Sequence, residues 1–302
     1  MKLPKSVLRE LAVAPGDDAD LAKRSTSHTA SDWLGKPGKK DDKEIAESDL
    51  EAFKTELQRV QQLLYANGTR ALLLIFQALD AAGKDGTIQH VMSGVNPQGC
   101  SVSSFKRPSD TELRHDFLWR CSRELPERGH IGIFNRSYYE EVLVVRIHPE
   151  LLETQGLPSG SKPTGALWRE RYEDINAFER HLDRGGTKIV KFFLHVSKDE
   201  QRRRFLARLD DPAKQWKFTP ADLAERKHFD EYSKAYEKAL TATTTKHAPW
   251  YVIPADNKPA MRALVAGVIV DVVDGLDLSP PQPAATAAQI DEARRALIAE
   301  SG

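Results

Sequence analysis

The sequence predicts an α/β fold with a parallel sheet of about five strands and helices on both of its faces. Apolar runs of strand length occur at five places along the chain, at 71–76, 100–105, 130–134, 189–196 and 250–253. Helical patterns lie between these runs, at about 86–93, 110–125, 168–184 and 198–240, the last with a break near Pro212. Strands that alternate with helices form parallel sheets, because each connection crosses a face of the sheet. The first run, Ala71 to Phe76, contains no polar residue, which is typical of a strand buried on both faces.

The segments outside the strands have their own patterns. Residues 1–47 are polar and interrupted by prolines and glycines, so we expect an extended N-terminal arm. From Ser48 to Ala66 apolar residues recur at helical spacing, and Ser48 with Glu51 matches a capping box. An amphipathic helix is predicted at 257–275, and the proline-rich tail after it ends in a weak helical pattern. These patterns predict an arm at 1–47, one main domain at 48–279 and a C-terminal tail at 280–302.

The composition excludes several classes of protein. The 302 residues include 44 Lys and Arg against 44 Asp and Glu, which argues against a surface built as a whole to bind nucleic acid or membrane. Cys100 and Cys121 are the only cysteines, so a disulfide framework and a four-cysteine metal site are excluded. No apolar stretch approaches the roughly 18 residues that span a bilayer, and no signal-peptide pattern opens the sequence. We expect a cytoplasmic protein.

The strand that ends near Phe76 leads into a candidate phosphate-binding loop. A strand, a small-residue loop with Gly-Lys and a helix form the context of a P-loop, in which backbone N–H groups and a lysine bind phosphate. The candidate positions are Ala82, Gly83, Lys84, Asp85, Gly86 and Thr87. Ala78 replaces the first glycine of the usual motif and Asp85 replaces its Ser or Thr, so an ordinary helix start remains the alternative. Asp80 favours the phosphate site, because an acid in such a loop needs a cation beside it, as in a Mg²⁺ site.

Two further strand ends carry candidate anion-binding residues. Arg136 follows the third strand and would supply a planar donor fork to phosphate at the carboxyl edge of the sheet; a solvated surface arginine is the alternative. After the fourth strand, Ser197 with Glu200 matches a capping box that opens a strongly basic helix. Six basic and two acidic residues lie from Arg202 to Lys217. This segment predicts an anion-binding lid with a hinge near Ser197, although such runs are often solvated faces.

Four motifs in this order resemble the polyphosphate kinase 2 family over roughly residues 24–275. They are LDAAGKDGT at 79–87, FNRSYYEEVLVVRIHPE at 134–150, SKDEQRRRFLARLDDPAKQWK at 197–217 and APWYVIPADNK at 248–258. The segment SFKRPSDTELRHDFLWR at 104–120, together with Asn135, resembles the class III subgroup, which phosphorylates nucleoside monophosphates and diphosphates. The resemblance implies a P-loop kinase-like, three-layer α/β fold with a helical lid at about 198–240.

The resemblance also implies an activity and a set of roles. The expected reaction is reversible transfer of the terminal phosphoryl group of inorganic polyphosphate to AMP or ADP, with Mg²⁺ or, in its place, Mn²⁺. Asp80 would hold the metal and orient or deprotonate the acceptor phosphate, and Lys84 would contact the reacting phosphates. Charge on the transferring group would be stabilised by Arg136, Arg204 and Arg208, and the polyphosphate chain would be held by Arg203, Lys214 and Lys217.

Nucleotide-binding residues and partners follow from the same resemblance. The candidates for the nucleotide pocket are Gly94, Asn96, Phe105, Lys106, Pro108, Asn135 and Glu140. For Phe105 a place in the core is an equal alternative, and Glu140 is also a candidate ligand of a second metal ion or a selector of monophosphate acceptors. The expected partners are polyphosphate and AMP, ADP or ATP, with no nucleic acid and no membrane, in a homo-oligomer such as a dimer or tetramer.

Two other functions remain open at the level of sequence. An ordinary ATP-dependent nucleoside monophosphate kinase uses the same sheet and lid. A non-catalytic sensor of polyphosphate or nucleotide is the other alternative, but a pure binder gains nothing from an acid such as Asp80 inside an anion-binding loop.

Overall fold

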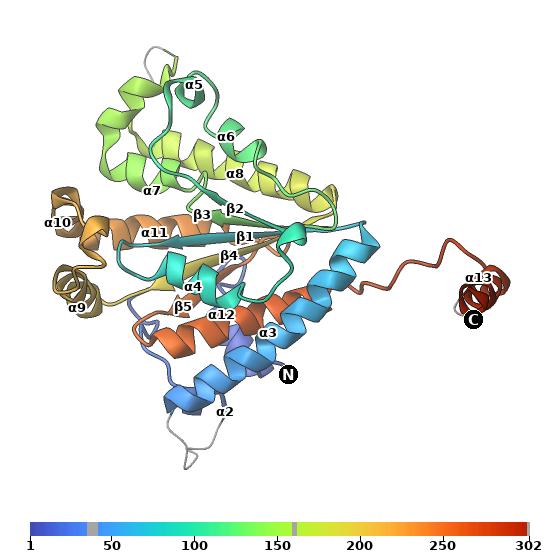
Figure 1. Ribbon diagram of the computed structural model, residues 1–302. Coiled ribbons are helices and arrows are strands. Elements are labelled where there is room, and N and C mark those ends of the chain that lie inside the picture. Colours follow the sequence, from blue (N-terminus) through green and yellow to red (C-terminus); the bar gives the residue numbers. More distant parts are fainter. Residues whose placement is uncertain (35–41, 159–161, 301–302) are drawn as a thin grey trace.

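A computed structural model describes residues 1–34, 42–158 and 162–300, and it confirms the predicted α/β fold with a five-stranded parallel sheet (Figure 1). The strand order is β2-β3-β1-β4-β5, so β1 lies at the centre between β3 and β4. The strands are β1 (Ala71–Ala78), β2 (Cys100–Ser104), β3 (Ile131–Asn135), β4 (Thr187–His195) and β5 (Trp250–Pro254). All eight residues of β1 are buried, as expected for the central strand of a sheet covered on both faces.

Helices cover both faces of this sheet. One face carries α3 (Asp42–Asn67), α4 (Lys84–Val91) and α12 (Lys258–Asp274), and the other carries α7 (Glu140–Ile147), α8 (Gly165–Arg184) and α11 (Phe229–Thr243) (Figure 1). α12 is packed between the sheet and α3, and eleven of its seventeen residues are buried. The Asn257 side chain accepts a hydrogen bond from the Ala260 N–H and so caps this helix.

The remaining elements surround this three-layer core. They are α1 (Lys5–Leu11), α2 (Ala30–Leu34), α5 (Asp110–Leu113), α6 (Trp119–Ser122), α9 (Lys198–Leu209), α10 (Pro220–Lys227) and α13 (Ala287–Ala299), with the 3₁₀ turns η1 (Pro97–Gly99), η2 (Pro149–Gln155) and η3 (Gln215–Lys217). The carboxyl ends of the strands point toward α9 and α10 (Figure 1). Among the described residues, no helix is long and apolar enough to cross a membrane.

The N-terminal segment differs from the expected extended arm. Within the described part of 1–47, α1 and α2 are helical, and the side chains of Val7, Leu11 and Trp33 are buried in the main core. Ala12 forms an antiparallel bridge with Tyr251 of β5. The prolines and glycines suggested a loose segment, but Val7 and Leu11 are four residues apart and therefore form one apolar helix face. Residues 35–41 lie outside the described residues.

Two expected helices have different boundaries in the structure. α3 begins at Asp42 and not at Ser48, so Ser48 and Glu51 lie inside the helix and form no cap. The helix expected at 110–125 is two short helices, α5 and α6. α7, which the sequence analysis did not assign, follows β3 directly. Periodicity alone does not reveal where a helix is interrupted, because the tertiary packing decides it.

Candidate active site

The loop after β1 has the geometry of a phosphate cradle. Gly83 precedes α4 with a φ angle of 104°, in the left-handed region that a glycine adopts without strain. The Lys84 side chain is buried, and its Nζ donates a hydrogen bond to the Ala78 carbonyl oxygen over 2.8 Å. The N–H groups in the first turn of a helix have no partner within the helix and can bind phosphate. The Thr87 hydroxyl is engaged within this segment, because it donates to the Gly83 carbonyl oxygen over 2.9 Å.

A charged cluster joins this loop to the end of β3. The Arg136 guanidinium lies 3.1 Å from an Asp80 carboxylate oxygen and 3.3 Å from a Glu140 carboxylate oxygen. Burial raises the pKa of Glu140, although the positive charges of Arg136 and Lys84 oppose this shift. Burial, and then the charge of Arg136, lower the pKa of Lys84. The structure thus brings together Asp80, Lys84, Arg136 and Glu140, which lie on two separate segments of the sequence.

The backbone is strained at two positions beside this cluster. Ala81 has a φ angle of 60° and Arg136 one of 65°, in a region that residues with a side chain rarely adopt. Such strain persists only where the surrounding structure holds the residue in place, and it is often found at functional sites. In Arg136 it turns the chain sharply after β3 and directs the guanidinium between the two carboxylates.

Arg204 connects the loop to the end of β5 instead of lying free in the lid. Its guanidinium donates to the carbonyl oxygens of Ala82 at 2.6 Å, Ala255 at 2.5 Å and Asp256 at 3.2 Å, and it pairs with Glu200. The side chain is only 7% exposed. In this conformation Arg204 supports the shape of the phosphate loop, a role that its place in a basic helix did not indicate.

The other basic residues of the predicted lid are more exposed and have nearby partners. Arg203 pairs with Glu200 and Lys214 pairs with Asp211, in both cases three residues away along the chain. Arg208 lies 3.5 Å from Asp222 of α10. Lys217 is stacked against the exposed Trp216 ring. Exposed pairs of this kind contribute little to stability, so an anionic ligand can displace them easily.

A cavity of about 120 Å³ opens beside the charged cluster. Besides Asp80, Arg136 and Glu140, its polar lining includes Gln201, Glu225, Arg226, Tyr232 and Tyr236, from α9, α10 and α11. The Gln201 amide donates to the Asp80 carbonyl oxygen at 3.0 Å and accepts from Arg226. The sequence analysis missed these five residues. The spacing of four between Tyr232 and Tyr236 was the available signal, since it puts both rings on one helix face.

The sequence analysis also missed two cations next to the phosphate loop. Arg262 on α12 comes within 3.9 Å of the position that a Gly86 Cβ would occupy, and its Nε is buried without a hydrogen-bond partner. Lys258 begins the same helix, and burial lowers its pKa, with Arg204 and Arg262 adding to the shift. Cations that repel one another in this way favour the binding of an anion.

The nucleotide-binding candidates fall at three different places, of which the first two are the opposite edges of the sheet. Asn135 lies at the end of β3, and its amide donates to the Asp85 carboxylate over 2.7 Å. Phe105 follows β2 at the same edge of the sheet, but it is buried against the Phe134 ring, so it belongs to the core. Gly94 and Asn96 lie at the opposite edge, because α4 carries the chain back to the amino end of β2. The structure does not bring these two residues to the site.

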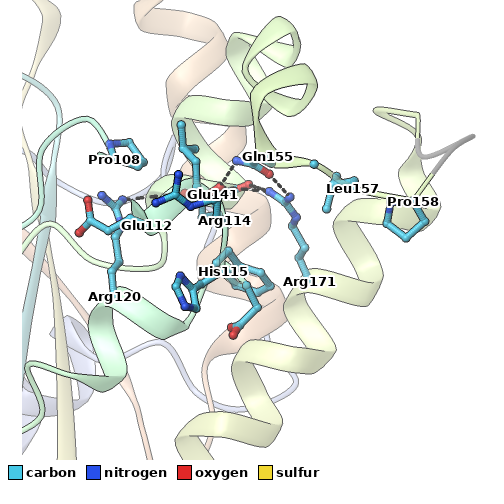
Figure 2. Close-up of a pocket in the computed structure, with 14 residues that line it drawn as sticks. Pro108, Glu112, Arg114, His115, Arg120, Glu141, Gln155, Leu157, Pro158 and Arg171 are labelled. Carbon is cyan, nitrogen blue, oxygen red and sulfur yellow. Dashed lines mark hydrogen bonds and ion pairs between the residues drawn. The ribbon is translucent and has the colours of Figure 1, made fainter. Parts of the chain in front are cut away.

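Pro108 and Lys106 belong to the margin of a second, larger cavity. This cavity, of about 310 Å³, lies between the α5–α6 segment and the start of α7, and Pro108 is part of its lining. The Lys106 carbonyl oxygen accepts a hydrogen bond from Arg120, another lining residue. Figure 2 shows Arg120, Glu141, Gln155 and Arg171 connected across the cavity. The charged groups of Arg120, Glu141 and Arg171 are therefore paired with one another.

The residues at the charged cluster fit a magnesium ion that is held mainly by substrate. Mg²⁺ is usually bound by one or two carboxylates together with phosphate oxygens and water. Asp80, with 34% of its side chain exposed, and Glu140 offer two such carboxylates next to Lys84. Among the described residues no group of three or more His, Cys, Asp or Glu side chains could hold a metal ion. The described residues at the carboxyl edge of the sheet therefore do not form a complete magnesium site from protein ligands alone.

Comparison with known proteins identifies the family. The family model "Polyphosphate kinase 2 (PPK2)" matches residues 40–279. An ADP-polyphosphate phosphotransferase of Rhodopseudomonas palustris is 57% identical over 77% of this chain and 81% of its own. An AMP/ADP-polyphosphate phosphotransferase of Meiothermus ruber is 46% identical over 80% and 86%. The crystal structure of polyphosphate kinase 2 from Arthrobacter aurescens superposes with a TM-score of 0.85 at 38% identity and covers 99% of both chains. The motifs, the fold and these matches agree, and the chain belongs to the polyphosphate kinase 2 family.

Proposed function

We propose that this protein transfers the terminal phosphoryl group of inorganic polyphosphate to ADP and AMP, reversibly and with Mg²⁺. The observation that carries the proposal is the cluster of Asp80, Lys84, Arg136 and Glu140 at the carboxyl ends of β1 and β3. Its support from related proteins is the activity named for the Rhodopseudomonas and Meiothermus relatives. The Meiothermus relative is named for both acceptors, which agrees with the class III features at 104–120 and Asn135.

The cluster has the parts that phosphoryl transfer requires. This chemistry depends mainly on positioning the reactants and neutralising charge. The N–H groups at the start of α4 and the Lys84 ammonium would bind the reacting phosphates, and Arg136 would shift from its carboxylate partners to the transferring group. Mg²⁺, when bound, neutralises phosphate charge and orients the phosphate oxygens. Asp80 would take part in holding the ion and would orient the acceptor phosphate.

We further propose that the segment 198–240 acts as a lid, with the end of α9 after Arg204, η3 and α10 as its mobile part. Three large apolar side chains in this part are exposed, Leu206 at 52%, Trp216 at 77% and Leu223 at 50%. Closure would bring basic residues such as Arg208, Lys214 and Lys217 onto the polyphosphate chain. α11, in contrast, packs against α7 and α8 and is expected to stay in place.

An end-point assay tests the proposed function. The purified protein is incubated with Mg²⁺, polyphosphate and either AMP or ADP, without added ATP, and ADP and ATP are measured separately. We expect ATP from ADP, and both ADP and ATP from AMP. Product formation from AMP with polyphosphate as the sole donor would exclude the ordinary nucleoside monophosphate kinase. Binding of polyphosphate without any turnover would contradict the proposal and favour a sensor.

Two expectations from the sequence analysis stay predictions. One is a dimer or tetramer, which light scattering coupled to size-exclusion chromatography would check. The other is the cytoplasmic location, which cell fractionation would check.

A further inference from the structure

A second charged cluster lies inside the molecule, between the sheet and α8. Lys191 of β4 and Glu179 of α8 are both 0% exposed, and the Lys191 Nζ lies 2.6 Å from a Glu179 carboxylate oxygen. Neither residue contributes to the active site described above. The sequence analysis included Lys191 in an apolar strand and assigned Glu179 to a helix, without a role for either.

This ion pair holds two tyrosines by their hydroxyl groups. The Glu179 Oε1 atom accepts hydrogen bonds from the Tyr138 hydroxyl at 2.9 Å and the Tyr139 hydroxyl at 2.8 Å. The Lys191 ammonium uses its other two hydrogens on the Tyr139 oxygen at 2.9 Å and the Thr243 carbonyl oxygen at 2.7 Å. Burial raises the pKa of both tyrosines well above its ordinary value, so both hydroxyls stay protonated and donate to Glu179. Every donor of the lysine has an acceptor.

The two tyrosines connect this buried cluster to the active site, because Tyr139 is only three peptide units from Arg136 along the chain. Tyr138 and Tyr139 lie in the chain between Glu140 and Arg136, and the Arg136 guanidinium contacts the carboxylates of both Asp80 and Glu140. Arg136 has a φ angle of 65°. Its N–H donates to the Phe76 carbonyl oxygen at 3.0 Å, which holds the chain before the strained residue. The tyrosine hydroxyls hold the chain after it.

Stability alone does not account for this arrangement. Removing two charges from water is costly, and a buried ion pair is often replaced by apolar residues of similar size without loss of stability. Two phenylalanines and an apolar pair would fill the same space. What the charged pair adds is direction, because each hydroxyl is fixed at one point relative to β4 and α8.

We propose that Lys191 and Glu179 are positioning residues for phosphoryl transfer, which act through Tyr138 and Tyr139 on the placement of Arg136 and Glu140. The proposal rests on the proposed function, since Arg136 and Glu140 are assigned to that reaction. A small displacement of a catalytic group, about 1 Å, can reduce the rate about 100-fold. The pair should therefore affect turnover more than the binding of either substrate.

Two changes and one control test this inference in the full-length protein. The double variant Lys191→Met with Glu179→Leu replaces the pair by apolar side chains and leaves no unpaired charge. The single change Tyr139→Phe removes only the hydroxyl that both charged residues contact. Tyr172→Phe is the matched control, because Tyr172 is a buried tyrosine of α8 whose hydroxyl accepts from Arg146 outside this cluster.

We expect the double variant to lower kcat about 10- to 100-fold while KM for ADP and polyphosphate changes less than about threefold. Tyr139→Phe should lower kcat in the same direction by about 3- to 10-fold, and Tyr172→Phe should leave it unchanged. Thermal unfolding measured on each variant gives the fraction of folded protein, to which kcat is referred.

The inference is overturned if kcat per folded molecule of Tyr139→Phe stays within about twofold of the parent, whether or not the double variant folds. It is also overturned if both variants raise KM and leave kcat unchanged. A parent protein with no polyphosphate-dependent activity would instead contradict the proposed function, so the two failures are distinguishable.

Discussion

The phosphate loop and the lid segment both carry basic residues, but they hold them in different ways. In the loop region Lys84, Arg136 and Arg204 contact groups on other elements of the fold, and Lys84 and Arg204 are buried. In the lid Arg203 and Lys214 pair with acids three residues away, and both are exposed. The first set is in place before substrate arrives. The second set is available to a polyanion that replaces weak local partners.

The largest expected effects concern the phosphate loop after β1. Lys84→Met removes the ammonium from the cradle while keeping a side chain of similar length, and Asp80→Asn removes the carboxylate expected to hold the metal ion. Each should lower kcat for ATP formation from ADP and polyphosphate at least about 100- to 1,000-fold, because one lost transition-state contact typically costs that much. Circular dichroism would show an unchanged fold. Activity near that of the parent in either variant would refute the site assignment.

The next effect compares two neighbouring arginines of α9. Arg204→Lys should lower both activity, by about tenfold or more, and the melting temperature, since an ammonium cannot bond the Ala82 and Ala255 carbonyl oxygens as the planar guanidinium does. Arg203→Lys is the control, because its side chain is 67% exposed and pairs with Glu200, three residues away. Equal losses of activity and melting temperature in the two variants would contradict the distinction between the buried Arg204 and the exposed Arg203.

A moderate effect is expected along the polyphosphate chain. Lys258→Gln should raise KM for polyphosphate about 10-fold, since Lys258 lies among Arg204 and Arg262 close to the loop. Lys214→Gln, in the exposed set, should raise it only about 2- to 3-fold and should leave kcat unchanged. KM measured with long polyphosphate at two salt concentrations checks both values. A larger rise in KM for the Lys214 variant than for the Lys258 variant would mean that the principal contact with polyphosphate is made by the lid.

The smallest expected effect is on stability and depends on pH. The pKa of Glu140 is raised by burial, so the folded state binds its proton more tightly than the unfolded state does. Stability is therefore lost as the pH rises from the ordinary glutamate pKa through the raised one. Glu140→Gln should raise the melting temperature by about 2 °C at pH 8 and have no effect near pH 4. Thermal scans at the two pH values check this, and a lower melting temperature at pH 8 would contradict it.

The sequence predicted the parts of the fold that depend on local patterns. The apolar run at 71–76 correctly predicted a buried strand, and a helix follows the Gly83-Lys84 loop as expected, although α4 spans Lys84–Val91 and not about 86–93. Gly94 and Asn96 were misplaced because α4, with eight residues, rises about 12 Å and returns the chain to the far edge of the sheet. Arg204 and Lys191 could not be interpreted from sequence, since their partners on other elements are 51 to 123 and 12 to 52 residues away along the chain.

The C-terminal tail has a practical consequence for the use of this protein. Residues 279–300 are exposed throughout, and α13 stands apart from the sheet on the side away from α9 and α10 (Figure 1). The segment before α13 contains Pro280, Pro281 and Pro283, which favour an extended and semi-rigid spacer. A fusion partner or a surface anchor joined to this end would therefore be kept at a distance from the strand ends where the substrates meet, and the enzyme could be immobilised there for continuous ATP regeneration.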